Sequence, residues 1–276
     1  MAECDWLLTN AHCPPATVPM HTARIAALLE PFLEQPLSQS QLDQISIYID
    51  LLLRWNARIN LTSIRHEEEI VTRHFGESFF LARHLFPAIS NSCHLGHNSC
   101  HPERSQDMRF AHVLAESKDP YSLKPPAPPQ GVLPETSNLP RALDIGSGAG
   151  FPALPLKLWA PHIHVTLIES NHKKAAFLRE VARALTLTNI NVLAGWVQAL
   201  VPSLTSQANV VTLRAVERLE TILPQALTFL APKGTLALLI TTPQIPQVQT
   251  QTTLKWHAPI NVPKSHSRIL LIGYND

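Results

Sequence analysis

A glycine-rich turn is the stretch of this sequence best suited to hold a ligand, and it directly follows a short apolar run. Residues 141–150 read RALDIGSGAG, and Ala142–Ile145 predicts a buried strand that ends where the glycines begin. Because glycine adopts backbone conformations that other residues avoid, a ligand can lie close against such a turn. Pro152 can start a helix, so strand, turn and helix make the first unit of a nucleotide-binding α/β sheet. The turn consists of Gly146, Ser147, Gly148, Ala149 and Gly150.

The spacing of these glycines separates two classes of nucleotide cofactor. The dinucleotide fingerprint G-x-G-x-x-G would need its third glycine at Phe151, so that fingerprint fails. Asp144 precedes the glycines, and an acid there suits a ligand with an ammonium and a sulfonium better than it suits a pyrophosphate. Glu169 ends the next apolar run, where a carboxylate can accept hydrogen bonds from both ribose hydroxyls. These features favour S-adenosylmethionine; the alternative is a turn that only packs a helix on a sheet.

Two later segments are expected to reach the same cofactor. A strand predicted at about 191–194 leads into Gly195–Gln198, where Val197 and Gln198 can offer apolar and polar contacts to an adenine ring. Arg214 follows a strand predicted at 209–213, so its guanidinium is expected at that strand's carboxyl end, beside the cofactor. We predict that Arg214 organises the cofactor carboxylate or the charge that develops on the acceptor, which makes it the candidate catalytic residue.

Composition and charge restrict the class of protein. The chain has 276 residues, of which 45% are hydrophobic and 16% charged, so it is globular rather than disordered. A formal net charge of +1 gives no general attraction to nucleic acid, and any affinity for RNA must come from local patches. No apolar run approaches the length of a membrane span, and the N-terminus lacks a basic region followed by an apolar one. We therefore expect a cytoplasmic protein.

Periodicity and composition divide the chain into four segments. We expect a disordered tail over 1–21, a helical N-terminal cap over 22–87, a low-complexity insertion or linker over 88–140 and a cofactor-binding domain over 141–276. In the last segment, strands and helices alternate, which predicts a doubly wound parallel sheet.

Cysteine and histidine residues cluster inside the 88–140 segment. Cys93, His97, Cys100 and His101 could in principle ligate zinc. The surrounding residues are rich in Ser, Asn and Pro and show no secondary-structure pattern. These features favour the interpretation of the segment as a solvated insertion. We therefore expect no metal site.

Polar side chains surround an aromatic residue at the end of the main helix of the cap. The helix opens at a Ser38–Gln41 capping box and leads into residues 54–65, where Trp55 and Asn56 could face a substrate. The alternative is a structural one, in which Asn60 and Thr62 close a turn.

Basic residues on two further helices are candidates for contact with RNA. A helix predicted over Glu67–Leu85 carries Arg73 and His74, although the histidine alone also fits an ordinary interfacial position. A second predicted helix starts at His172, and its basic face makes Lys173 a candidate contact. The cations of that face are Lys173, Lys174, Arg179 and Arg183.

Four stretches carry a resemblance to a known family. They are RWNARINLTSIR at 54–65, Arg73-His74 with Ser78, LDIGSGAGFPALPL at 143–156, and Leu213-Arg214-Ala215. Over about 38–86 and 141–273 the chain resembles the glucose-inhibited division protein B family of 16S rRNA guanine-N7 methyltransferases. The resemblance implies a class I methyltransferase fold, a Rossmann-like doubly wound sheet with a helical N-terminal cap. It also implies S-adenosylmethionine as the cofactor, and 16S rRNA or the 30S subunit as the substrate.

The family's residue roles transfer to matching positions of this chain. The resemblance implies substrate contacts by Arg73, His74 and the Trp55-Asn56 pair. It implies cofactor contacts by Gly146, Phe151, Glu169, Val197, Gln198 and Arg214.

The chain also departs from the family pattern at four places. Trp196 stands where the family has Arg, Gln198 where it has Glu, Glu77 where it has Asp, and Ile240-Thr241 where it has Lys-Gly. Two cations that could hold RNA or polarise a base are thereby missing. Two alternatives therefore stay open: a methyltransferase for a small-molecule or protein acceptor, and a non-catalytic protein that binds S-adenosylmethionine or rRNA. A dehydrogenase is the least favoured. We expect a monomer without an obligate protein partner.

Overall fold

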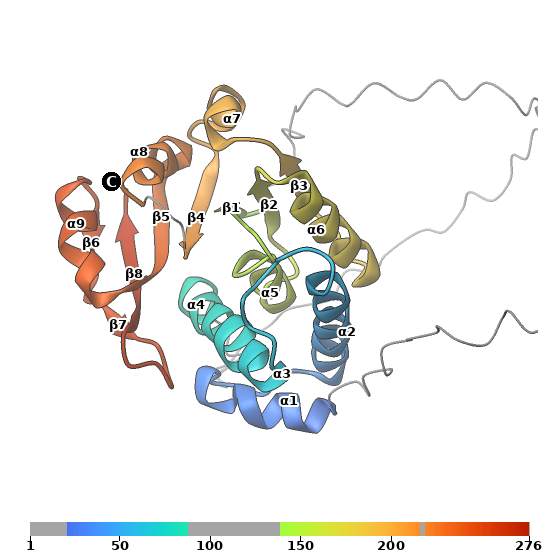
Figure 1. The fold of residues 1–276 in the computed structure, drawn as a ribbon. Helices are drawn as coiled ribbons and strands as arrows, with labels where there is room; N and C mark the ends of the chain where they lie inside the picture. The colour runs from blue at the N-terminus through green and yellow to red at the C-terminus, as the bar shows by residue number, and fades with distance from the viewer. Residues whose placement is uncertain (1–20, 88–138, 216–218, 276) are drawn as a thin grey trace, which may run out of the picture. The chain divides into compact units, whose positions relative to one another are not determined.

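A computed structural model describes residues 21–87, 139–215 and 219–275, and these residues belong to one compact unit (Figure 1). The predicted tail lies outside the described residues, except for His21. The predicted insertion also lies outside them, except for Leu139 and Pro140, and so does its cluster of Cys93, His97, Cys100 and His101. Within the described part of the chain, no helix is long and apolar enough to cross a membrane.

The N-terminal helices begin and end where local signals place them. Helix α1 (Thr22–Leu29) runs into a 3-10 turn, η1 (Glu30–Phe32), and α2 (Gln39–Asn56) follows. Ser38 caps α2 with the predicted capping box, in which its hydroxyl accepts from the Gln41 N–H and the Gln41 side chain accepts from the Ser38 N–H. The buried face of α2 holds Leu42, Ile45, Tyr48, Ile49, Leu51, Leu52 and Asn56.

The helix predicted over Glu67–Leu85 is interrupted by a π-helical segment. The chain forms α3 (Glu67–Glu69), the π-helix η2 (Ile70–Gly76) and then α4 (Glu77–Leu85). Such segments are rare and often occur at functional sites. Periodicity does not reveal this one, although it carries Arg73 and His74.

Eight strands form one sheet in the order β3-β2-β1-β4-β5-β8-β6, and β7 also pairs with β8. The strands are β1 (Arg141–Ile145), β2 (His164–Glu169), β3 (Ile190–Ala194), β4 (Ala208–Arg214), β5 (Leu230–Thr241), β6 (Lys255–Trp256), β7 (Ile260–Asn261) and β8 (Arg268–Tyr274). The helices and turns between them are α5 (Ala153–Trp159), α6 (His172–Ala184), α7 (Val197–Leu204), α8 (Leu219–Phe229), η3 (Thr242–Gln244) and α9 (Ile245–Thr250).

The predicted parallel sheet is confirmed for the first five strands and is wrong for the last three. Strands β1 to β5 pair in parallel, whereas β8 is antiparallel to β5, β6 and β7. Short loops join β6, β7 and β8, and parallel pairing would need a longer crossover between them. With β8 inserted antiparallel beside β5, the sheet has the class I methyltransferase arrangement.

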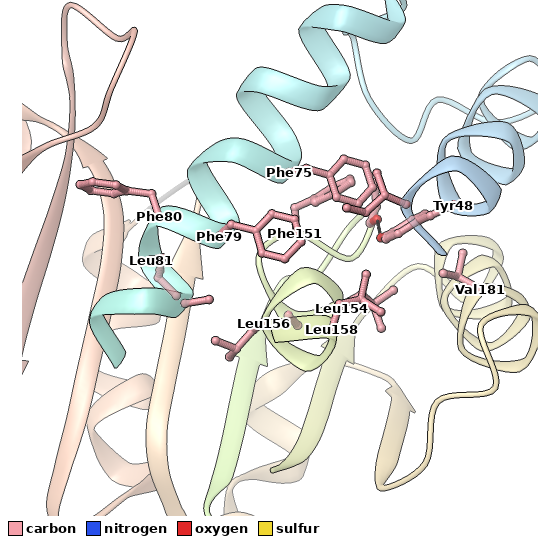
Figure 2. Packing of buried hydrophobic residues seen from close by; sticks show 14 of the residues in the cluster. Tyr48, Phe75, Phe79, Phe80, Leu81, Phe151, Leu154, Leu156, Leu158 and Val181 are labelled. Atoms are coloured by element: carbon pink, nitrogen blue, oxygen red, sulfur yellow. Dashed lines mark hydrogen bonds between the residues drawn. The ribbon is translucent and has the colours of Figure 1, made fainter. Parts of the chain in front are cut away.

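The N-terminal helices and the sheet share one hydrophobic core. At its centre Tyr48 stacks on Phe151 with ring centroids 5.3 Å apart and meets Phe75 edge-on at 5.2 Å (Figure 2). The Tyr48 hydroxyl donates to the Ala149 carbonyl at 2.5 Å. The cap therefore packs directly on the glycine-rich turn.

Candidate active site

The glycine turn adopts the backbone that its sequence predicts. Gly146, Gly148 and Gly150 have φ of 71°, 55° and 88°, values that side chains with a Cβ rarely adopt. A Cβ on Gly150 would collide with the Tyr48 hydroxyl, so the close approach of α2 also requires glycine. On Gly148 a Cβ would meet only one atom within 4 Å. The turn is therefore packed on one side and open on the other.

Glu169 lies at the carboxyl end of β2, as its position in sequence predicts, and its side chain holds this turn. Its Oε2 accepts from the Gly148 N–H at 2.8 Å, and its Oε1 accepts from the Asn171 N–H at 2.8 Å. The Gly195 N–H donates to the Glu169 backbone carbonyl at 3.0 Å. Since each carboxylate oxygen has a second lone pair, Glu169 can still accept from a ribose hydroxyl.

Asp144 has a buried carboxylate oxygen without a partner. The register of β1 and β4 sets Asp144 opposite Thr212, whose hydroxyl donates to Oδ1 at 2.6 Å. Oδ2 is buried and has no hydrogen-bond partner in the structure. Burial raises the pKa of Asp144 to about 6, and the hydrogen bond from Thr212 and the charge of Arg214 oppose this rise. A buried oxygen that lacks a donor, next to an open glycine turn, fits the ammonium of S-adenosylmethionine.

The other predicted cofactor residues differ in their surroundings. The Ser147 hydroxyl donates to the Asp144 carbonyl at 3.2 Å and is buried. The Phe151 ring is sandwiched between Tyr48 and His74, so it supports the turn, and any cofactor contact would come from its backbone. Val197 and Gln198 open helix α7, with Val197 buried and Gln198 exposed.

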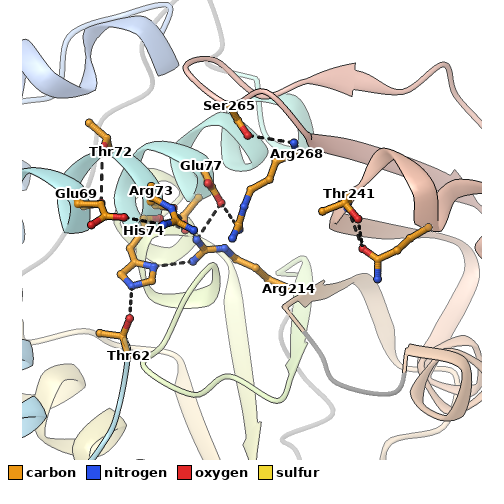
Figure 3. Close-up of polar contacts among 12 residues, drawn as sticks. Thr62, Glu69, Thr72, Arg73, His74, Glu77, Arg214, Thr241, Ser265 and Arg268 are labelled. Carbon is orange, nitrogen blue, oxygen red and sulfur yellow. Dashed lines mark hydrogen bonds and ion pairs between the residues drawn. The ribbon is translucent and has the colours of Figure 1, made fainter. Parts of the chain in front are cut away.

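Arg214 lies at the carboxyl end of β4, as predicted, and its guanidinium is held by the π-helical segment and α4 (Figure 3). Nη2 donates to the Glu77 carboxylate at 2.9 Å and to the Arg73 carbonyl at 2.6 Å. Arg268 donates to the same Glu77 oxygen at 2.9 Å. The side chains of Arg214 and Glu77 are only 6% and 4% exposed, so this is a buried ion pair. The Arg214 Nε is buried and has no partner in the structure.

His74 joins this ion pair to the glycine turn. Its Nδ1 lies 3.1 Å from Arg214 Nη1, which can only donate, so Nδ1 accepts and Nε2 carries the proton. Nε2 then donates to the Thr62 hydroxyl at 2.8 Å. Burial, and next the charge of Arg214, lower the pKa of His74 to about 2, and its ring stacks on Phe151 at 4.6 Å. These contacts favour the interpretation of His74 as an interfacial histidine, and its imidazole is neutral.

The polar segment after α2 closes a loop. The Asn56 carboxamide oxygen accepts from the N–H groups of Leu61 and Thr62, and its nitrogen donates to the Thr62 carbonyl at 2.9 Å. Asn56 is buried, and Trp55 packs edge-on against Phe177. The segment thus closes a turn, as the structural alternative expected, but through Asn56 and Thr62 rather than Asn60 and Thr62, and contact of Trp55 or Asn56 with RNA stays a prediction. Lys173 is exposed in the first turn of α6, and its RNA contact is equally untested.

A cavity of about 90 Å³ lies at the carboxyl ends of β4 and β5. Ile240 and Thr241, which stand in place of the Lys-Gly of the family pattern, line it together with Gln244. Arg214 and Arg268 also line it, so β8 contributes a second guanidinium to the cavity. Arg268 was not among the residues that the sequence singled out.

Three residues that organise the site were missed by the sequence analysis: Tyr48, Thr212 and Arg268. Glu77 was singled out only as a departure from the family pattern, not as the ion-pair partner of Arg214. Tyr48 had a detectable signal, because it lies at helical spacing from Ile45 and Leu52. Arg268 had none, since it is distant in sequence from Glu77 and the two meet only in the folded chain.

Comparisons with known proteins point to a family of methyltransferases. The family model described as rRNA small subunit methyltransferase G matches residues 41–96 and 131–268. A relative with the name Ribosomal RNA small subunit methyltransferase G, from Roseiflexus castenholzii, is 36% identical over 207 residues, which cover 72% of this chain and 67% of the relative. One of the same name from Bacillus subtilis is 30% identical over 154 residues, which cover 55% of this chain and 44% of the relative.

Solved structures show a weaker likeness. Precorrin-6y C5,15-methyltransferase from Geobacter metallireducens is 15% identical with a TM-score of 0.43, and the match covers 50% of this chain and 81% of that one. The family model, in contrast, spans both the helical cap and the sheet. The chain therefore belongs to the rRNA small subunit methyltransferase G family.

Proposed function

We propose that this chain transfers a methyl group from S-adenosylmethionine to N7 of a guanine in 16S rRNA. The observation that carries the proposal is the unpartnered, buried Asp144 oxygen beside the Glu169-held glycine turn, in a chain of this family. The residues that would hold the cofactor are Asp144, Gly146, Ser147, Gly148, Gly150, Phe151, Glu169, Val197, Gln198 and Arg214.

The chemistry asks the protein to position the acceptor rather than to remove a proton. When bound, the cofactor supplies an electrophilic methyl group on its sulfonium. Guanine N7 has a free lone pair and no proton, so no general base is needed. His74 fits this requirement, because both of its ring nitrogens are engaged and its pKa is about 2. Arg214 and Arg268 would orient the base at the cavity beside β4.

The proposal includes the setting of the reaction. The substrate would be 16S rRNA or the 30S subunit, and the enzyme would work in the cytoplasm as a monomer without an obligate protein partner. Trp196, Gln198 and Thr241 depart from the family pattern, so two alternatives are kept: a small-molecule or protein acceptor, and a non-catalytic binding role.

Transfer of labelled methyl to 30S subunits or 16S rRNA from a strain that lacks the endogenous enzyme tests the proposal. We expect a new 7-methylguanosine on nucleoside analysis. A reaction inhibited with S-adenosylhomocysteine is the control. No incorporation, with cofactor binding intact, would move the function to another acceptor or to a non-catalytic role.

A conservative change at Arg214 tests its role in orientation. Arg214→Lys keeps a cation but loses the fork that reaches Glu77, His74 and the Arg73 carbonyl, so we expect kcat to fall at least about tenfold. Steady-state methyl transfer measures the change, and near-ultraviolet circular dichroism checks folding. Full turnover in the variant would show that the guanidinium is dispensable.

A further inference from the structure

A second cleft, of about 320 Å³, lies between the π-helix η2 and the turn before β8. Three cations line it: Arg73 from η2, Lys264 from the turn and Arg268 from β8 (Figure 3 shows Arg73 and Arg268). Glu77 is the one acid among its described lining residues. In a chain of net charge +1, this is a local concentration of positive charge.

The acids that touch this cleft do not neutralise all of its cations. One oxygen of Glu77 already accepts from both Arg214 and Arg268. Arg73 pairs at the surface with Glu69, where both side chains are more than a third exposed. Among the described residues, Lys264 has no ion pair, and it is exposed. The cleft therefore has cationic groups available for an anion.

Hydroxyl groups complete the lining. Ser265 and Ser267 lie in the cleft beside the cations, as does Thr72, whose hydroxyl already donates to the Glu68 carbonyl at 2.9 Å. The Ser265 hydroxyl accepts from the Arg268 N–H at 3.1 Å, which ties the turn to the start of β8. Guanidinium, ammonium and hydroxyl donors together are the set that proteins use to hold phosphodiester oxygens.

Arg268 connects this cleft to the cavity beside Arg214, because it lines both. A polymer that places a base in the cavity can therefore place a neighbouring phosphate in the cleft. We propose that the Arg73–Lys264–Arg268 cleft binds a backbone phosphate of the RNA next to the target guanine. This proposal rests on the proposed function and adds the turn before β8 to the RNA-binding surface.

The change Lys264→Gln tests the proposal, because it removes the charge of one phosphate contact and keeps a polar, unbranched side chain. The affinity for a 16S rRNA fragment is measured over a series of salt concentrations, without cofactor. We expect affinity to fall about fivefold at low salt and the slope of log K against log salt to become shallower by about one. Lys264→Arg keeps the cation and is expected to keep the wild-type slope.

Lys233→Gln is the matched control. Lys233 is exposed and has a left-handed backbone, with φ of 61° against 56° for Lys264, but it lies in the amino-terminal part of β5. We expect it to bind RNA as the wild type does. If Lys264→Gln keeps the wild-type slope of log K against log salt while the wild type binds RNA, the cleft does not bind a phosphate. The proposed function would then still stand. If the wild type shows no salt-dependent binding to rRNA, the proposed function fails as well.

Discussion

Replacing Glu77 by alanine is expected to lower the free energy of unfolding by about 3–5 kcal/mol. The Glu77 side chain is 4% exposed and accepts from both Arg214 and Arg268. Its loss would leave the buried guanidinium of Arg214 without a carboxylate, and burial already lowers the pKa of that group. An uncompensated charge in the interior costs more than the ion pair contributes when it is complete.

Urea unfolding of the variant and of a matched control measures this cost. Glu69→Ala removes the surface ion pair with Arg73, 2.6 Å long with side chains 39% and 45% exposed, and is expected to cost at most about 1 kcal/mol. Adding Arg214→Met to Glu77→Ala should recover part of the loss, because no buried cation then remains at that position. Equal costs for Glu77→Ala and Glu69→Ala would contradict the assignment of a buried ion pair.

Replacing Asp144 by asparagine is expected to weaken S-adenosylmethionine binding at least about 30-fold. Asn can still accept from the Thr212 hydroxyl, but it has no charge to offer the cofactor's ammonium at the position of the unpartnered Oδ2. Titration calorimetry with the cofactor measures the change. Thr212→Val, which removes the hydroxyl and keeps the carboxylate, is the comparison and is expected to bind the cofactor more tightly than Asp144→Asn does. Wild-type affinity in Asp144→Asn would rule out the ammonium contact.

The same substitution is expected to stabilise the protein in the absence of cofactor at neutral pH. Burial raises the pKa of Asp144 to about 6, above its value in the unfolded chain. Between about pH 4 and 6 the folded state therefore holds this proton more tightly, and stability falls as the pH rises through that window, by roughly 3 kcal/mol in all. Asn has no such proton to lose.

Urea unfolding at pH 4.5 and pH 7.5 tests the sign. The wild type should lose more stability than Asp144→Asn between these two pH values. Cofactor binding by the wild type should show the opposite trend and weaken below about pH 6, because a protonated Asp144 no longer attracts an ammonium. Identical pH profiles for the two proteins would contradict the raised pKa.

Local patterns in the sequence predicted the start of α2, the glycine turn and the succession of strands and helices, but not the π-helical segment η2. The Ser38–Gln41 capping box starts α2, and the alternating glycines of 146–150 form the left-handed turn. The alternation of strands and helices predicts the parallel pairing of β1 to β5, and Asp144 and Glu169 fall at the carboxyl ends of their strands. Each of these features depends on backbone preference or hydrophobic periodicity within a few residues, so the printed sequence is sufficient.

Only the tertiary structure determined which side chains of the candidate site pair with one another. Glu77, Arg214 and Arg268 belong to α4, β4 and β8, and their ion pairs form only when these elements pack together. The neutral state of His74 follows from burial against Phe151 and from the guanidinium of Arg214. Contacts between distant segments leave no local pattern in a sequence, because burial and charge pairing depend on which elements the fold brings together.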